Sequence, residues 1–303
     1  MRILVVGAGV IGSVYAARLV AAGHDVSLLA RGARRQALES HGVVLHTRAR
    51  NLRAQPRIVD AGTAGLSADL TVVAVRTTQL DDILHLVADM DSPTVAFLQH
   101  LGPHAERVRS LLGAERTVFA FPGIGGLLRG DGSVDYVEIG AQPTTIDAAA
   151  DGADLLRSAI ASTGMRTALE PDMPAWLATH SVFVACLGAG VLSCAGSAES
   201  LASDRDQLRT VVQAIREGFA SLESSDTHVT PAALRVLFTR MPRWFAAVYW
   251  RRALRSPVGT VAIAPHVRSS REDEFAALCS DVLDGADTRL TPTLNALLTP
   301  WAA

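Results

Sequence analysis

The first thirty residues contain the feature that most constrains the fold of this chain. The stretch RILVVGAGVIGSVYAARLVAAGHDVSLLA, residues 2–30, reads in order as an apolar strand, a glycine turn, an alanine-rich helix and a second strand. Gly7, Gly9 and Gly12 form the spacing G-x-G-x-x-G at the junction of the first strand and the helix. The sequence therefore predicts one β-α-β unit at the N-terminus.

The three glycines predict a phosphate-binding turn. In such a turn the first glycine permits a tight bend, the second lets a pyrophosphate approach the backbone, and the third lets the helix pack on the strand. Val10 and Ile11 then lie at the N-terminus of the helix, which faces the phosphates, and we expect both residues to bind the cofactor. An ordinary glycine turn is the alternative, but the position directly after VVG, in a unit of the right length, favours a dinucleotide cofactor.

The end of the second strand indicates which dinucleotide this is. An acidic residue there binds the ribose hydroxyls of NAD, whereas this strand runs into Arg31, with Arg34 and Arg35 close behind. The planar guanidinium of arginine suits a 2′-phosphate because it can donate two parallel hydrogen bonds. A solvated basic loop is the alternative for Arg34 and Arg35. The pattern favours NADP(H).

Three further strands are predicted at residues 69–76, 94–99 and 117–121, with helix-like segments between them. This alternation predicts a Rossmann-type, doubly wound parallel sheet. Ligands of such sheets lie beyond the carboxyl ends of the strands. We therefore expect Arg76 and Gln79 of the segment VAVRTTQ, together with Gln99 and His100, near the cofactor.

The pattern changes after about Pro171, and no further strand is obvious. Four segments suit helices, 174–195, 205–222, 231–254 and 268–283, and Thr230-Pro231 resembles a helix start. The sequence thus predicts two domains. Residues 1–170 form an NADP(H)-binding Rossmann domain, and residues 171–303 form an all-helical substrate domain.

Composition excludes several classes of partner. A net charge of -2 gives no reason to expect a nucleic acid, and the three cysteines lack the spacing of a metal site. The most apolar run, 181–196, is shorter than the about 20 residues of a membrane helix, and a strand beginning at Arg2 leaves no room for a signal peptide. We expect a cytoplasmic protein without metal, nucleic acid or membrane. The oligomeric state stays open, with a homodimer as one option.

The chain resembles the ketopantoate reductase family along nearly its whole length. The resemblance rests on GAGVIG, Arg31, VAVRTTQ, FLQHLGPHAE, FPGIGG, QPTTI, DMPAWLATH and LTPTLNALL, which occur in this order. It implies an NADPH-binding Rossmann domain joined to a helical domain, with a 2-keto acid reduced in the cleft between them.

The chain departs from this family at the positions that carry its chemistry. The family's Q-N-G becomes Gln99, His100 and Leu101. Two residues after Trp176, where the family has its proton-donating lysine, stands Ala178; the substrate-binding asparagine one turn later becomes Val182, and one further turn brings Cys186. These three positions share one helical face, which we expect to form an apolar wall of the substrate cleft.

The alanine is not explained by a general replacement of lysine. The chain contains no lysine, and its 28 cationic residues are all arginine, so drift alone would leave an arginine at position 178. An engineered change would not account for His100 and Val182. We interpret the set as natural divergence.

Few polar groups remain for catalysis. Counting back from the C-terminal proline motif, the resemblance places the family's late carboxylate on Glu272 and a hydroxyl on Thr260, although Glu272 also suits a solvated helix face. His100 can exchange a proton near neutral pH, or it can stack beside the nicotinamide. His180 and Trp176 are expected to be structural.

Three functions are compatible with these residues. The first is an NADPH-dependent reductase of a keto substrate that is larger and less polar than ketopantoate. The second is a non-reductive cyclase or isomerase of a specialised pathway on the same fold, favoured by the loss of lysine and asparagine. The third is a binding protein that senses the cofactor. The intact cofactor features place the reductase first.

Overall fold

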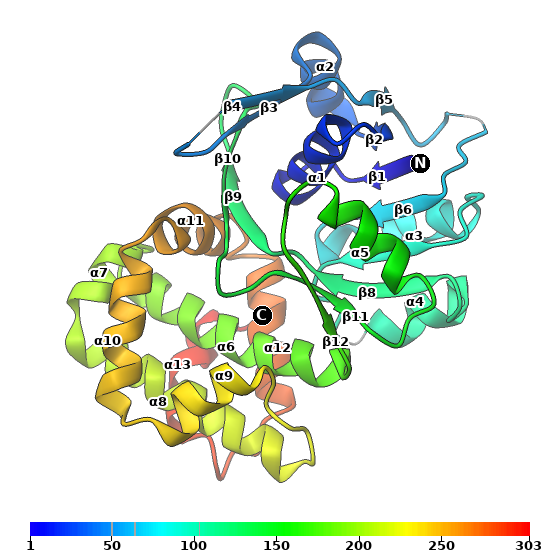
Figure 1. Ribbon diagram of the computed structural model, residues 1–303. Helices are drawn as coiled ribbons and strands as arrows, with labels where there is room; N and C mark the ends of the chain where they lie inside the picture. Colours follow the sequence, from blue (N-terminus) through cyan, green and yellow to red (C-terminus); the bar gives the residue numbers. More distant parts are fainter. Residues whose placement is uncertain (50, 64, 103) are drawn as a thin grey trace. The chain divides into compact units, whose positions relative to one another are not determined.

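The computed structural model describes residues 1–49, 51–63, 65–102 and 104–303 (Figure 1). Its contacts divide the chain into two units, Met1–Met173 and Pro174–Ala303. The first unit contains all the described strands, and the second consists of helices. The N-terminal β-α-β unit and the change to helices both follow the sequence pattern.

The first unit is built on an eight-stranded sheet. Its order is β12 (Thr167–Glu170), β11 (Thr144–Asp147), β8 (Thr117–Phe121), β7 (Val95–Leu98), β6 (Leu70–Val73), β1 (Arg2–Val6), β2 (Asp25–Leu29) and β5 (Arg57–Val59). Neighbouring strands are parallel, except that β11 runs antiparallel to β8. β1 lies between β2 and β6, so successive connections leave it on opposite sides, and this is where doubly wound sheets bind ligands.

Helices cover both faces of this sheet. Figure 1 shows α1 (Val10–Ala21) and α5 (Ala153–Ala161) on one side, and α3 (Leu80–Ala88) and α4 (His104–Leu112) on the other. A further helix, α2 (Gly32–His41), follows β2, and a 3-10 turn, η1 (Thr77–Gln79), precedes α3. The predicted doubly wound architecture is confirmed, with the antiparallel strand β11 as an addition near its edge.

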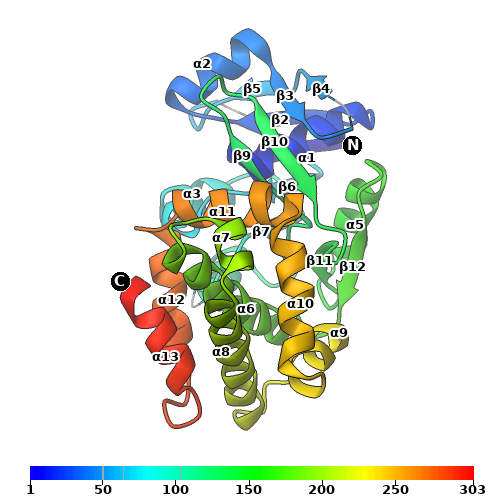
Figure 2. The same cartoon turned by 90° about the vertical axis from the view of Figure 1, so that its left-hand side faces the viewer.

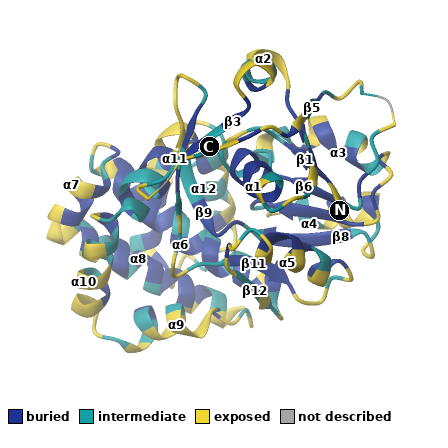
Figure 3. Cartoon of the chain, turned by 45° about the horizontal axis from the view of Figure 1, so that its top comes forward, coloured by how far each residue is buried: buried dark blue, intermediate teal, exposed yellow. Residues whose placement is uncertain are grey.

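A second, four-stranded sheet was not predicted. Its order is β4 (Asn51–Ala54), β3 (Val43–His46), β10 (Val134–Glu138) and β9 (Ile124–Leu128). All four strands contact α1, which therefore lies between the two sheets. Residues 12–19 of α1 are buried, and this explains why the helix is rich in alanine and has no broad polar face (Figure 3).

One cation is buried in this layer. Arg18 of α1 donates from Nη1 to the Tyr136 hydroxyl (2.8 Å) and to Oε1 of Glu138 (2.9 Å), and from Nη2 to the carbonyl oxygen of Thr163 (2.7 Å). Burial opposes the charged form, but these bonds outweigh it and raise the pKa of Arg18. The arginine therefore ties α1 to β10 and to the end of α5.

The second unit packs its helices around one apolar core. They are α6 (Met173–Ser193), α7 (Ala198–Ser203), α8 (Arg205–Ser224), α9 (Ala232–Arg235), η2 (Val236–Arg240), α10 (Arg243–Leu254), η3 (Val258–Ile263), α11 (Ala264–Ser269), α12 (Glu274–Asp284), α13 (Pro292–Leu298) and η4 (Thr299–Trp301). α8 packs between α13 and α10 (Figure 2). Among the described residues, only α6 is long and apolar enough to cross a membrane, and 78% of its most apolar window is buried. Much of its length, from Val182 to Leu192, belongs to the apolar core of this unit.

Two of the predicted helices were wrong in their extent. The expected helix 231–254 is interrupted at Met241, whose backbone is extended, because Pro242 lacks an N–H and disfavours helical geometry in the residue before it. The expected helix 268–283 is divided between α11, which ends at Ser269, and α12, which begins at Glu274. The Asp273 carboxylate accepts the Glu274 N–H at this new start.

Candidate dinucleotide site

The glycine turn lies between the ends of β1, β2 and β6. Gly7 has a φ of +105°, and a Cβ atom added there would lie 2.8 Å from the Ala74 carbonyl oxygen, just beyond β6. Its N–H donates to the carbonyl oxygen of Leu29 at the end of β2 (3.3 Å). Both the backbone angle and the close approach require glycine at this position.

Gly12 and Gly9 have opposite surroundings. A Cβ atom at Gly12 would lie only 1.8 Å from the Gly7 carbonyl oxygen, so this glycine permits the contact between helix and turn. A Cβ atom at Gly9 would meet nothing within 4 Å. Gly9 is the N-cap of α1 and has no side chain to cap it, so the N–H groups of Val10 and Ile11 in the first turn suit an anion. This arrangement fits a pyrophosphate.

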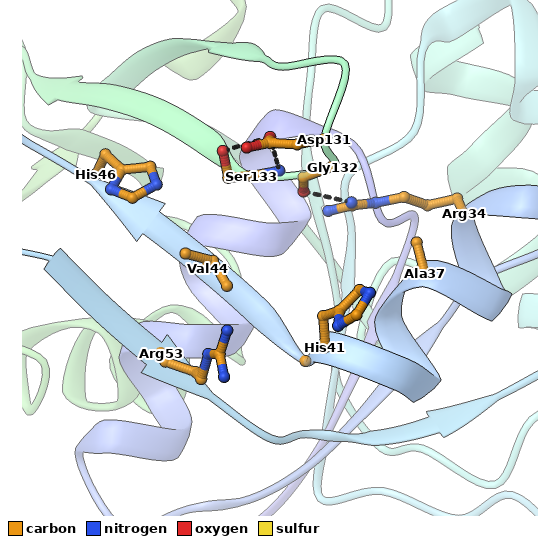
Figure 4. Close-up of a pocket in the computed structure, with 10 residues that line it drawn as sticks. Arg34, Ala37, His41, Val44, His46, Arg53, Asp131, Gly132 and Ser133 are labelled. Atoms are coloured by element: carbon orange, nitrogen blue, oxygen red, sulfur yellow. Dashed lines mark hydrogen bonds between the residues drawn. The ribbon is translucent and has the colours of Figure 1, made fainter.

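Arg34 supports this turn from α2. Its Nε donates to the Ala8 carbonyl oxygen (3.0 Å), its Nη2 to the Ser13 hydroxyl (3.0 Å), and its Nη1 to the Gly132 carbonyl oxygen between β9 and β10 (2.6 Å). Figure 4 shows this last bond. The alternative of a solvated loop therefore does not hold for Arg34. Arg35 is also engaged, through ion pairs with Glu39 and Asp60.

A pocket of about 240 Å³ lies beside Arg34 (Figure 4). Its wall includes His41 of α2, His46 of β3 and Arg53 of β4, with Asp131 opposite. It adjoins Arg34 and the second sheet, and the three glycines of the turn lie outside its lining.

Arg31 stands where the sequence pattern placed it, directly after β2. It is the N-cap residue of α2, and its side chain is 68% exposed. Its Nη2 lies 3.5 Å from Oδ2 of Asp82 on α3, a carboxylate that the sequence reasoning missed. Because both side chains are exposed, this ion pair is weak and leaves the guanidinium available to a ligand phosphate.

β6 ends at Val73, three residues before the predicted end of this strand, and Arg76 lies between β6 and η1. Its backbone N–H donates to Oε1 of Gln79 (3.4 Å), so these two predicted residues are joined in one local turn. Thr77 donates from Oγ1 to the His100 carbonyl oxygen (2.6 Å) and links the end of β6 to that of β7. The structure thereby brings the predicted residues of both strands to one edge of the sheet.

Gln99 has the most unusual surroundings at this edge. Its side chain is 6% exposed, and neither its Oε1 nor its Nε2 has a hydrogen-bond partner among the residues that the structure describes. A buried amide without partners is costly, so the site is suited to a ligand that supplies them. The neighbouring His100 ring lies 4.7 Å from the Phe121 ring at the end of β8.

The three residues of the predicted cleft wall on α6 differ in their burial. Ala178 is half-buried, whereas Val182 is 6% exposed and Cys186 is fully buried in the helical core. A Cβ atom at Gly218 of α8 would lie 2.4 Å from the Val182 side chain, and burial raises the pKa of the Cys186 thiol. Val182 and Cys186 pack against other helices of their own unit, which corrects the prediction.

Two other predicted residues lie apart in the helical unit. Glu272 is exposed in the turn between α11 and α12, so it does not lie on the face of a helix. Thr260 lies in η3, and its hydroxyl donates to the Ser256 carbonyl oxygen (3.3 Å). His180 is buried and stacks on Trp176 with ring centroids 4.8 Å apart.

The sheet order and the glycine turn define a class of protein, a Rossmann-type dinucleotide-binding domain followed by a helical domain. A sequence model of the family described as "Ketopantoate reductase PanE/ApbA" matches residues 3–150. The matched part, which lies within the N-terminal unit, is similar to the ketopantoate reductase family, in agreement with the resemblance found in the sequence.

One curated relative and two solved structures add detail. The chain is 34% identical over 84 residues to the uncharacterized oxidoreductase YkpB of Bacillus subtilis, a match that spans 28% of this chain and 27% of that relative. D-mandelate dehydrogenase with NADH and anilino(oxo)acetate has a TM-score of 0.75 at 14% identity and covers 99% of this chain and 97% of its own. A PanE/ApbA family ketopantoate reductase from Ralstonia eutropha has a TM-score of 0.75 at 18% identity, with 99% and 98% covered. These structures share the fold.

Proposed function

We propose that this protein is an NADP(H)-dependent reductase whose substrate is a keto compound other than ketopantoate. The observation that carries the cofactor half of this proposal is the edge formed by an open Gly9, the exposed Arg31 and the buried Gln99 amide, which has no hydrogen-bond partner among the described residues. These residues offer donors to a pyrophosphate, a cation to a 2′-phosphate and an amide to the nicotinamide end. A bound nicotinamide supplies the hydride.

The cofactor preference can be tested at Arg31. NADPH should bind more tightly than NADH, and Arg31→Ala should remove most of that preference, about tenfold or more, because a hydrogen bond to a charged group contributes about 1.5–3 kcal/mol. Asp82→Asn should strengthen NADPH binding a few-fold by removing the carboxylate that competes for Arg31. Equal binding of both cofactors by the unmodified protein would contradict the proposal.

A matched control lies on the same helix as Asp82. Asp81 forms an ion pair with Arg107 (2.6 Å), so Asp81→Asn removes the same charge from α3 without touching Arg31. We expect it to leave the ratio of NADPH to NADH affinity nearly unchanged. Fluorescence titration of each variant with both nucleotides measures these ratios.

The substrate half of the proposal rests on Ala178. The half-buried alanine stands where the family resemblance places the proton-donating lysine, and Val182 offers no polar group where the resemblance places an asparagine. A small keto acid needs such partners, because its carboxylate is costly to bury alone. A bulkier and less polar ketone is the better substrate class, and His100 is the candidate proton donor.

Reduction can be followed by the absorbance of NADPH with a panel of ketones. We expect oxidation with bulky, apolar ketones and little or none with ketopantoate. His100→Gln should lower the turnover of the accepted ketone by about 100-fold or more while NADPH affinity changes little, as expected of a positioned acid. Reduction of ketopantoate at a rate ordinary for an enzyme would overturn this substrate class.

A second candidate function is favoured by the same alanine. Without the lysine, the chain suits a non-reductive cyclase or isomerase that keeps the dinucleotide as a scaffold. Tight NADPH binding with no oxidation by any ketone of the panel would favour this second function. For either function we propose a cytoplasmic protein.

A further inference from the structure

Helix α10 presents an apolar face to solvent. Trp244 is 65% exposed, Val248 58%, Tyr249 45% and Phe245 39%, and all four lie on this one helix. The opposite side is packed in the core, where Ala246 and Leu254 are fully buried. Figure 3 shows the exposed residues along α10. A cluster of large apolar side chains on one exposed face marks an interaction site.

The order of residues along this face is self-complementary. Trp244, Val248 and Arg252 follow one another at intervals of four residues and therefore form one stripe along the helix. Position 248 is equidistant from 244 and 252. When two copies of α10 lie antiparallel about an axis at Val248, each Trp244 ring lies opposite the partner subunit's Arg252. An arginine over an indole ring is a favourable cation–π pair, and the two-fold axis gives two such pairs in the dimer.

The charges around α10 agree with an aromatic partner for Arg252. The sequence has no acidic residue between Asp226 and Glu272, and neither Arg243 nor Arg252 forms an ion pair in the described part of the chain. Burial and the nearby charge of Arg243 both lower the pKa of Arg216 on α8. The Trp244 ring supplies an electron-rich face that suits Arg252 as a partner.

We propose that the protein forms a two-fold homodimer through antiparallel packing of α10 against α10, with Val248 at the axis. Trp244, Tyr249 and Phe245 are 65%, 45% and 39% exposed, so they can bury only those fractions of about 150–250 Å² each, a part of the about 800 Å² that each partner contributes to a standard interface. The proposal is independent of the cofactor and substrate proposed above, because none of the α10 residues belongs to the dinucleotide site.

The first experiment measures the molar mass of the full chain by sedimentation velocity over a series of concentrations. The unmodified protein should be a dimer, and Val248→Arg should raise the dimer dissociation constant by at least about 100-fold, because it places two like charges together at the axis. Val236→Arg is the matched control, since Val236 is a 40% exposed valine of η2 outside this face, and it should change nothing. Circular dichroism shows that both variants are folded.

The second experiment tests the register. Val248→Cys should give a covalent dimer under mild oxidation with copper phenanthroline, because a residue at a two-fold axis meets its own copy; Val236→Cys and the unmodified protein should give none. A monomer at high micromolar concentration would overturn the proposal, as would a dimer that Val248→Arg leaves intact. A monomer that binds anionic vesicles and loses this binding on Trp244→Ala would assign the face to a membrane surface instead.

Discussion

The guanidinium of Arg34 donates a 3.0 Å hydrogen bond to the carbonyl oxygen of Ala8, inside the glycine turn. The same side chain also reaches the Ser13 hydroxyl on the first turn of α1 and the Gly132 carbonyl oxygen. One cation therefore holds the turn, the start of α1 and the loop between β9 and β10 together. Burial lowers its pKa, yet it stays charged at any ordinary pH.

This relationship predicts a loss of cofactor binding that is independent of cofactor type. Arg34→Leu should weaken the binding of NADPH and of NADH by about tenfold or more each. The reason is that the turn loses hydrogen bonds to a charged group, each contributing about 1.5–3 kcal/mol, that hold its shape. The affinity ratio should stay as it is in the unmodified protein, in contrast to Arg31→Ala. Isothermal titration with both nucleotides distinguishes the two arginines, and a selective loss of NADPH would show that Arg34 binds the 2′-phosphate itself.

Gln99 should show opposite effects on stability and on binding. Gln99→Leu removes a buried amide that has no partner among the described residues, so the free energy of unfolding should rise by about 1–2 kcal/mol without ligand. NADPH affinity should fall by about tenfold. Gln142→Leu is the control, because Gln142 donates to the Pro122 carbonyl oxygen (3.2 Å) and its loss should not stabilise the protein. A destabilised Gln99→Leu variant would contradict this account of the amide.

Glu217 of α8 gives the helical unit a dependence on pH. Its carboxylate accepts hydrogen bonds from the N–H groups of Thr293 (2.7 Å) and Leu294 (3.0 Å), from the Thr293 hydroxyl (2.6 Å) and from Nε2 of Gln213 (2.9 Å). Burial raises its pKa, but the hydrogen bonds outweigh burial and hold the pKa below its usual value. Its contribution to stability is therefore complete above the unfolded-state pKa of about 4.3 and is lost as the pH falls through the lower folded-state pKa.

Glu217→Gln should consequently destabilise the protein by about 2 kcal/mol near neutral pH, and the difference should shrink in acid, where the unmodified carboxyl is also neutral. Glu223→Gln on the same helix is the control. Glu223 pairs with Arg235 at the surface (2.7 Å), and such pairs contribute about 1 kcal/mol or less. Urea unfolding across this pH range measures both. A constant difference at every pH would contradict the role of the charge.

The glycine turn was predictable because its causes are local. Gly7 is required by its φ of +105°, and Gly12 is required because a Cβ atom there would lie 1.8 Å from the Gly7 carbonyl oxygen. Both requirements arise within six residues of sequence. The role of Arg34 was not predictable, because one of its acceptors, Gly132, lies 98 residues away. The second sheet escaped prediction for the same reason, since β3 pairs with β10, far along the chain.

The error at Val182 and Cys186 has a different cause. Helical periodicity places residues on one face only relative to each other, and α6 is apolar on nearly every side, so no polar face indicates which side meets the core. Gly218 of α8 lets Val182 approach closely, and this contact decides the orientation. Of the three predicted wall residues, only Ala178 remains half-buried.

Ala178 therefore carries the sharpest remaining test of the proposed function. In Ala178→Lys the new ammonium would be partly desolvated, with Val182 rather than an asparagine one turn away, and desolvation lowers the pKa of a lysine. We expect NADPH affinity to change little, while turnover of a bulky ketone falls. If instead Ala178 marks a disabled lysine enzyme, the restored amine should raise reduction of 2-keto acids by about 100- to 10,000-fold. Turnover of both substrate classes by this variant and by Ala178→Met, which adds similar bulk without charge, decides between divergence and simple loss.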